Sequence, residues 1–184
     1  MSHPSPTLLG VTLKTAVVHT VTYFVVGWLA YTFVDYSAKY ADPNLKMYMR
    51  QTTDPWVMAG PLFQPIRGVL FGIIFYLLRD VVFAKKNGWL ILWCVLVIAG
   101  ILSTFGPSPG SIEGILYTIV PLPLHLMGLP EVLLQSLLLS AIVYYWVNHP
   151  EKRWLTWLMV AIFVVVMLLP ILGLFASGRV ASGN

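Results

Sequence analysis

Charged side chains are scarce in this chain of 184 residues: 10% are Asp, Glu, Lys or Arg, whereas 58% are hydrophobic. A soluble domain of this length could not bury so many apolar side chains in one core, but a bilayer accepts runs of about 20 apolar residues. The shortage of charge, together with a mean hydropathy of +0.81, predicts an integral membrane protein.

Cysteine is nearly lacking, and so are the motifs of common enzymes. Cys94 is the single cysteine, which excludes a disulfide within the chain and a metal site built from several cysteines. No two histidines have the spacing of metal ligands, so we expect no metal. Phosphate-binding glycine loops, zinc-protease and hydrolase motifs are missing, as is a pair of carboxylates within one apolar segment. We therefore expect no cofactor and lean against catalysis.

The excess of basic residues, 11 Lys and Arg against 7 Asp and Glu, does not form a nucleic-acid surface. These residues gather at the ends of apolar runs, as Arg79, Lys85–Lys86 and Lys152–Arg153 do, where they anchor helices and meet anionic headgroups. No contiguous basic face remains to follow a phosphate backbone. We expect membrane lipids as partners and no nucleic acid.

Apolar segments separated by polar or turn residues predict an all-α integral membrane protein, a single domain over residues 1–184 with about five transmembrane helices. The approximate spans are 11–34, 57–78, 88–105, 131–147 and 154–176. The third and fourth are just long enough to cross a bilayer, so four or six spans are alternatives.

The distribution of Lys and Arg orients these spans. With five crossings, Lys14, the Arg79–Lys86 group and Lys152–Arg153 fall on one side, whereas Ser103–Pro130 has no Lys or Arg. The positive-inside rule then places the N-terminus in the cytoplasm of an inner-membrane protein and the C-terminus outside. The segment Asp35–Pro55 balances three basic against three acidic residues and is expected to be a solvated loop or surface helix.

The segment between the third and fourth spans is too apolar for an ordinary loop and too rich in Pro and Gly for one helix. Ser111 can cap a short helix from Ile112 to Val120, with Glu113 in the first turn, where the helix dipole favours an acid. This helix lies on the external interface or re-enters the membrane. The interface is favoured because re-entrant backbone must find hydrogen bonds inside a small protein, and His125 is expected there too.

Arg67 is the charged residue that stands out within an apolar segment. It belongs to Gly60–Gly68, in which Pro61 and Pro65 remove two backbone donors and leave carbonyls about one turn earlier unpaired. Gln64 can donate to such carbonyls. The pattern predicts a polar notch in the second span.

Three interpretations of Arg67 follow. Its guanidinium can hold an anion, such as a lipid phosphate or a substrate carboxylate. It can instead form an intramembrane ion pair with Glu113 or Glu131. Alternatively, the prolines delay the second span until Ile66, and Arg67 extends to the outer headgroups.

Polar residues on the first span share one helical face: Thr12, Thr15, His19 and Thr22 recur at spacings of three and four. That face is expected to point at protein. Hydrogen-bonded packing is the favoured role of His19, and a proton relay is the alternative.

Small residues recur on the second span. Gly68 and Gly72 form a Gly-x-x-x-Gly motif, which Gly60 extends at a multiple of the same interval. Such residues let helices approach closely in lipid, and the neighbouring helix can belong to the same chain or to another copy. Gln135 on the fourth span can add an interhelical hydrogen bond.

Three functions fit these features. The first is a non-catalytic accessory or assembly subunit that binds other membrane-protein subunits or copies of itself. The second is a homo-oligomeric carrier or channel for an anionic or lipid-like solute, with Arg67 as the anion contact. The third is an integral membrane enzyme acting on lipid or isoprenoid.

Overall fold

Helices are the regular secondary structure of the part that the computed structural model describes, residues 6–47 and 49–182, with residues 176–182 described by backbone alone. Four helical segments are long and apolar enough to cross a membrane: α1 (Leu8–Phe33), α5 (Gly60–Leu77), the segment Leu122–Asn148, and α11 (Arg153–Ser182). The apolar segment Gly88–Leu102 is shorter. This architecture confirms the all-α class and indicates a membrane protein.

Short helices occupy the connections. They are α2 (Tyr36–Ala41), α3 (Pro43–Lys46), α4 (Pro55–Met58), α6 (Arg79–Val82), α8 (Ile112–Tyr117) and α9 (Leu122–Met127). The longer α10 (Leu129–Asn148) follows α9, and Gly88–Leu102 consists of α7 (Gly88–Val97) and a π-helix, η1 (Ile98–Leu102).

Three acids begin the short helices of the first polar connection. The carboxylates of Asp35, Asp42 and Asp54 accept hydrogen bonds from backbone N–H groups at the starts of α2, α3 and α4. Each carboxylate satisfies a donor that the helix itself leaves unpaired. For Asp54 these bonds, first from Trp56 N–H and then from Arg50, hold the pKa below its usual value.

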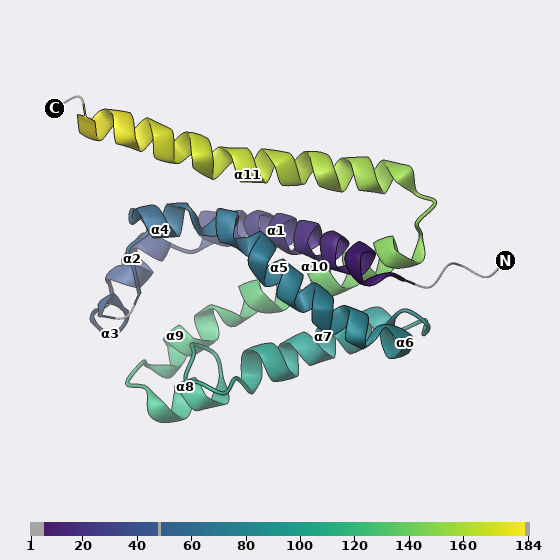
Figure 1. The fold of residues 1–184 in the computed structure, drawn as a ribbon. Coiled ribbons are helices and arrows are strands. Elements are labelled where there is room, and N and C mark those ends of the chain that lie inside the picture. The colour runs from purple at the N-terminus through teal and green to yellow at the C-terminus, as the bar shows by residue number, and fades with distance from the viewer. Residues whose placement is uncertain (1–5, 48, 183–184) are drawn as a thin grey trace.

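The chain runs back and forth between two ends of a bundle (Figure 1). One end carries the start of α1, α6 and the connection from α10 to α11. The other carries α2, α3, α8 and α9, and α11 ends on that side. The central helix is α1, which packs against α5, α10 and α11.

The glycine motif of α5 makes the closest helix contact. A Cβ on Gly68 would lie 2.5 Å from Cα of Ala16, and one on Gly72 would lie 2.6 Å from Cα of Thr12. These glycines therefore let α5 approach α1, so the neighbouring helix of the motif belongs to the same chain. Gly60 lies outside this contact, since its nearest neighbour there, the Tyr23 hydroxyl, would be 3.7 Å from a Cβ.

The apolar core lies toward the end that carries α6. Phe75, Val82, Leu92 and Val143 are each 0% exposed and come from four different helices. Lys14 closes this end, because its ammonium donates to the carbonyl of Trp146 at 2.8 Å, in the last turn of α10. A cation at a helix C-terminus is favoured by the helix dipole.

Two expectations about helix bounds need correction. α5 begins at Gly60 and continues through Pro65, so a second span that starts only at Ile66 is wrong. The hydroxyl of Ser111 caps α8 as predicted, by accepting from Gly114 N–H at 2.9 Å, but α8 ends at Tyr117 and not at Val120.

His125 is buried within the protein, between the segments on either side of α8. It is 1% exposed, its Nδ1 accepts from Gly110 N–H at 3.1 Å, and its Nε2 lies 3.3 Å from the Thr118 hydroxyl. Gly110 has φ +87°, which favours glycine. His125 thus ties the segment before α8 to the segment after it.

Candidate functional site

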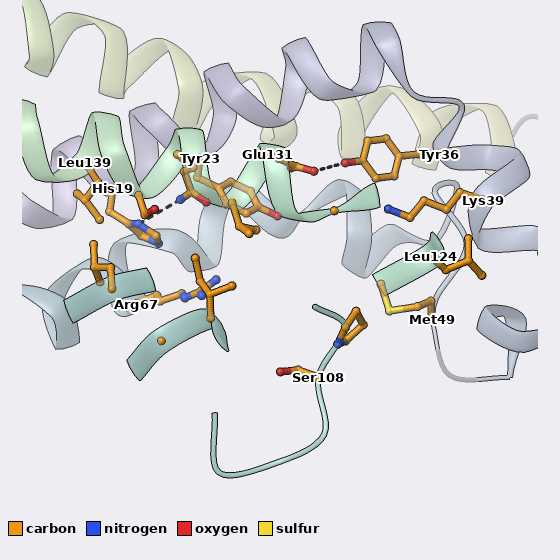
Figure 2. Close-up of a pocket in the computed structure, with 18 of the residues that line it drawn as sticks. His19, Tyr23, Tyr36, Lys39, Met49, Arg67, Ser108, Leu124, Glu131 and Leu139 are labelled. Carbon is orange, nitrogen blue, oxygen red and sulfur yellow. Dashed lines mark hydrogen bonds between the residues drawn. The ribbon is translucent and has the colours of Figure 1, made fainter. Parts of the chain in front are cut away.

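A cavity of about 500 Å³ lies at the end of the bundle opposite the apolar core. Side chains from α1, α5, α7, η1 and α10 form its walls, and α2, α3 and the segment before α8 add further residues. Figure 2 shows Arg67, His19, Glu131, Tyr36 and Lys39 directed toward this space. Four predicted site residues therefore come together, three of them lining the cavity (Arg67, His19 and Glu131) and Gln64 bonded to His19.

His19 is held between two glutamine amides. Its Nε2 lies 3.2 Å from Oε1 of Gln64, and its Nδ1 lies 3.4 Å from Nε2 of Gln135. Because Nε2 of Gln64 donates to the carbonyl of Gly60 at 3.2 Å, its Oε1 is left to accept from His19. This arrangement is that of a neutral imidazole with one N–H donating and one nitrogen accepting.

The surroundings of His19 confirm two sequence predictions. Thr15, His19 and Thr22 are 0%, 1% and 3% exposed, so the polar face of α1 does point at protein. Gln135 makes an interhelical hydrogen bond, as expected for a polar side chain on the fourth apolar segment. Both ring nitrogens of His19 are occupied, which favours a positioning role over a proton relay.

Arg67 presents a cation to the cavity. Its guanidinium carbon lies 5.5 Å from the centre of the Phe71 ring, and its side chain is exposed. Among the described residues, the ion pairs that form join Arg50 to Asp54 and Arg79 to Asp80, so Arg67 pairs with neither Glu113 nor Glu131. The guanidinium fork keeps donors for a further acceptor.

Glu131 is bonded instead to a tyrosine from a distant part of the chain. The hydroxyl of Tyr36 in α2 donates to Oε2 of Glu131 in the first turn of α10 (Figure 2). The other oxygen, Oε1, faces α1 at Gly27, where a Cβ would lie 3.8 Å away. Glu131 thus fastens α2 to α10 while Arg67 lines the same cavity.

Lys39 is a second cation of the cavity, which the sequence analysis did not identify. Its ammonium lies 5.1 Å from the centre of the Tyr36 ring and faces Gly128, where a Cβ would be 3.8 Å from Nζ. Burial lowers the pKa of Lys39, and the nearby Glu131 carboxylate opposes that shift. Burial raises the pKa of Tyr36 and of Tyr40, and for Tyr36 the hydrogen bond to Glu131 adds to it.

The segment 35–55 is therefore more than a solvated loop. Leu45 is 4% exposed, and five residues of the segment line the cavity: Tyr36, Lys39, Tyr40, Leu45 and Met49. A signal was present in the sequence, because Tyr36 and Tyr40 share one helical face at a spacing of four. The three basic and three acidic residues of the segment instead suggested that it faces solvent.

Glu113 does not join the site. It lies on α8 and is not among the residues that line the cavity. The same connection contributes Ser108 and Pro109 to the lining instead. Of the two acids predicted near Arg67, Glu131 alone shares its cavity.

The cavity combines a positive balance with apolar walls. Arg67 and Lys39 outnumber Glu131, and the tyrosine hydroxyls add neutral donors, while Leu96, Leu139 and Phe71 supply apolar surface. Its size falls within the range of roughly 300–1,000 Å³ typical of small-molecule sites. Such a lining suits a solute with an anionic group and an apolar body.

Metal binding finds no support in the part of the chain that the structure describes, where no three His, Cys, Asp or Glu side chains gather closely enough to hold an ion. His3 lies outside the described residues. The chain matches no protein-family model, no curated protein and no solved structure.

Proposed function

We propose that this chain is a small multi-pass inner-membrane protein that binds an anionic, lipid-like solute in its cavity and acts as a carrier for it. In this proposal the five apolar segments each cross the membrane, with the N-terminus in the cytoplasm and the C-terminus outside. Transport by copies of one chain is the form we favour, and lipids are the immediate partners.

One observation carries the proposal: Arg67 stands at the cavity with no carboxylate partner among the described residues. A charged side chain within an apolar span costs a few kcal/mol on insertion scales, so its retention marks a function or a partner. Glu131 accepts from Tyr36 and forms no ion pair with Arg67, so an anionic solute is the partner that we propose for Arg67.

The cavity favours a carrier over the two other hypotheses. An accessory subunit needs contact surface and has no use for an internal space lined by two cations. The carboxylate and the imidazole of the cavity already have partners within the protein, since Glu131 is bonded to Tyr36 and His19 to two amides. Binding is what these side chains can do without further groups.

The test measures retained anionic lipid by native mass spectrometry of the protein extracted gently from its own membrane. The variant is Arg67→Gln, and Arg153→Gln is the matched control, because Arg153 is exposed at the start of α11 and remote from the cavity. We expect Arg67→Gln to lose the bound anion, since a bond from a charged donor contributes about 1.5–3 kcal/mol, and Arg153→Gln to keep it.

Two outcomes would contradict the proposal. Equal retention of the anion by both variants would mean that Arg67 does not hold it. A foreign subunit present in stoichiometric amount, with no bound anion in the wild-type protein, would favour the accessory role instead.

A further inference from the structure

The mouth of the cavity lies on the side of the bundle. Of the residues that line it, Arg67, Gly100 and Pro109 are exposed, whereas the others are buried or half-buried. These three belong to α5, η1 and the segment before α8. The lining residues of α2 are half-buried and Leu45 of α3 is buried, so that end of the cavity is the less open one.

Helix packing accounts for a mouth at this place. α5 packs mainly against α1, and α7 packs mainly against α10, so the two helices diverge on either side of the cavity. Gly100 on η1 also leaves the cavity open, because it has no side chain and a Cβ there would meet nothing within 4 Å.

The π-helical turn adds to this opening. Ser103 N–H donates to the carbonyl of Ile98 at 2.8 Å, so η1 has a wider turn than the α-helix before it. Turns of this kind are rare and occur often at functional sites. Here the turn carries Gly100 and Ile101, both of which line the cavity.

The rim of the mouth is apolar. Ile66 and Leu70 on α5 are 64% and 58% exposed, and Ile98 on η1 is 58% exposed. These residues lie within three positions of Arg67 or Gly100 in the sequence, on segments that are themselves apolar. In a bilayer such a rim contacts acyl chains, because hydrocarbon takes the place of water around apolar helices.

We infer that the solute is a membrane-resident amphiphile that enters sideways between α5 and η1, with its anionic headgroup at Arg67 and its tail leaving through the apolar rim. The inference rests on the proposed function and adds to it the source and class of the ligand. A free anion from water carries the same charge but has no apolar part to occupy the rim, and it would have to cross hydrocarbon to reach the mouth.

The test narrows the mouth and leaves the charged groups in place. Gly100→Trp adds a large side chain where the structure is open, and Gly173→Trp is the matched control, since a Cβ at Gly173 on α11 also meets nothing within 4 Å. Both variants are placed in phosphatidylcholine nanodiscs, and the binding rate of lysophosphatidic acid with a fluorescent tail is recorded. Gly100→Leu provides a smaller obstacle if the Trp variant does not fold.

We expect Gly100→Trp to slow binding about tenfold or more, which corresponds to a barrier increase of about 1.4 kcal/mol, with Gly173→Trp close to the wild-type protein. Glycerol 3-phosphate in the aqueous phase should not compete. A normal rate in the Gly100 variants would overturn the lateral entry, and effective competition by glycerol 3-phosphate would identify a soluble anion as the ligand.

The Arg67 and Gly100 variants together distinguish failure of the side entrance from failure of the anion site. If Arg67→Gln loses lysophosphatidic acid while both Gly100 variants bind at the wild-type rate, the anion site stands and the side entrance is wrong. If Arg67→Gln binds lysophosphatidic acid as the wild-type protein does, both the anion site and the inference are wrong.

Discussion

The two ends of the bundle are built from the same helices but packed in different ways. Near α6, side chains of α5, α6, α7 and α10 form the apolar core, and Phe75, Val82, Leu92 and Val143 are each 0% exposed. Near α2 the same α5, α7 and α10 enclose a cavity of about 500 Å³ with polar groups in its walls. The difference in packing arises from the positions of the glycines and from the divergence of α5 and α7.

Glycine illustrates this difference most directly. At the packed end, Gly88 lies so close to the preceding connection that a Cβ would be 1.7 Å from the carbonyl oxygen of Val82. At the cavity end, Gly100 on the continuation of the same helix faces open space. The same residue type therefore permits contact at one end and an opening at the other.

The largest difference is expected between these two glycines when each is replaced by alanine. Gly88→Ala places a Cβ against the carbonyl of Val82, so the two backbone segments must move apart. The variant should destabilise the fold by about 3 kcal/mol or more. Gly100→Ala should be neutral or stabilise by up to about 1 kcal/mol, because alanine favours the helix. Thermal unfolding in detergent, followed by the loss of the monodisperse peak in size-exclusion chromatography, measures both. Similar midpoints for the two variants would show that the ends are not packed differently.

A smaller difference is expected between two phenylalanines on one helix when each is replaced by alanine. Phe75 is 0% exposed in the core, whereas Phe71, whose ring centre lies 6.4 Å from that of Phe75, lines the cavity. Phe75→Ala should cost about 3–5 kcal/mol, and Phe71→Ala well under half of that, since it enlarges a space that already exists. The same unfolding assay compares them, and a larger loss for Phe71→Ala would contradict the assignment of core and cavity.

The smallest effect is expected at the hydrogen bond that closes the cavity end. Tyr36→Phe removes the donor to Glu131 and should destabilise by about 1–3 kcal/mol, with faster amide hydrogen exchange in α2 and α3. Tyr31→Phe is the control, because Tyr31 stacks on Tyr36 and is 61% exposed. Unchanged exchange in α2 of the Tyr36 variant would mean that other contacts hold this segment.

The same bond has an expected pH dependence. The pKa of Tyr36 is raised above its ordinary value of 10.0, chiefly by burial and then by the bond to Glu131, so the folded state favours the neutral phenol. The stability that it contributes is complete below pH 10.0 and is lost as the pH rises through the folded-state pKa. The stability difference between wild type and Tyr36→Phe should therefore persist up to about pH 10.0 and shrink as the pH rises from there through the folded-state pKa.

The sequence predicted those parts of the site that are polar residues inside apolar runs. His19, Gln64, Arg67 and Glu131 stand out for that reason, and periodicity alone put His19 on the protein-facing side of α1. The pairing of Glu131 could not be predicted, because its partner Tyr36 lies 95 residues away in a segment whose charges suggested solvent. Contacts between distant segments depend on how helices diverge, which a local pattern does not encode.

The outer helix α11 contributes none of the described residues that line the cavity. It lies across α1 and α5 on one side of the molecule (Figure 1), and its buried contacts include Leu155 and Met159. The residues that line the cavity and those of the outer helix can therefore diverge independently during evolution. Among relatives of this protein, we expect α11 to vary freely in sequence wherever it keeps an apolar surface, and engineers can attach reporters to it while leaving the cavity unchanged.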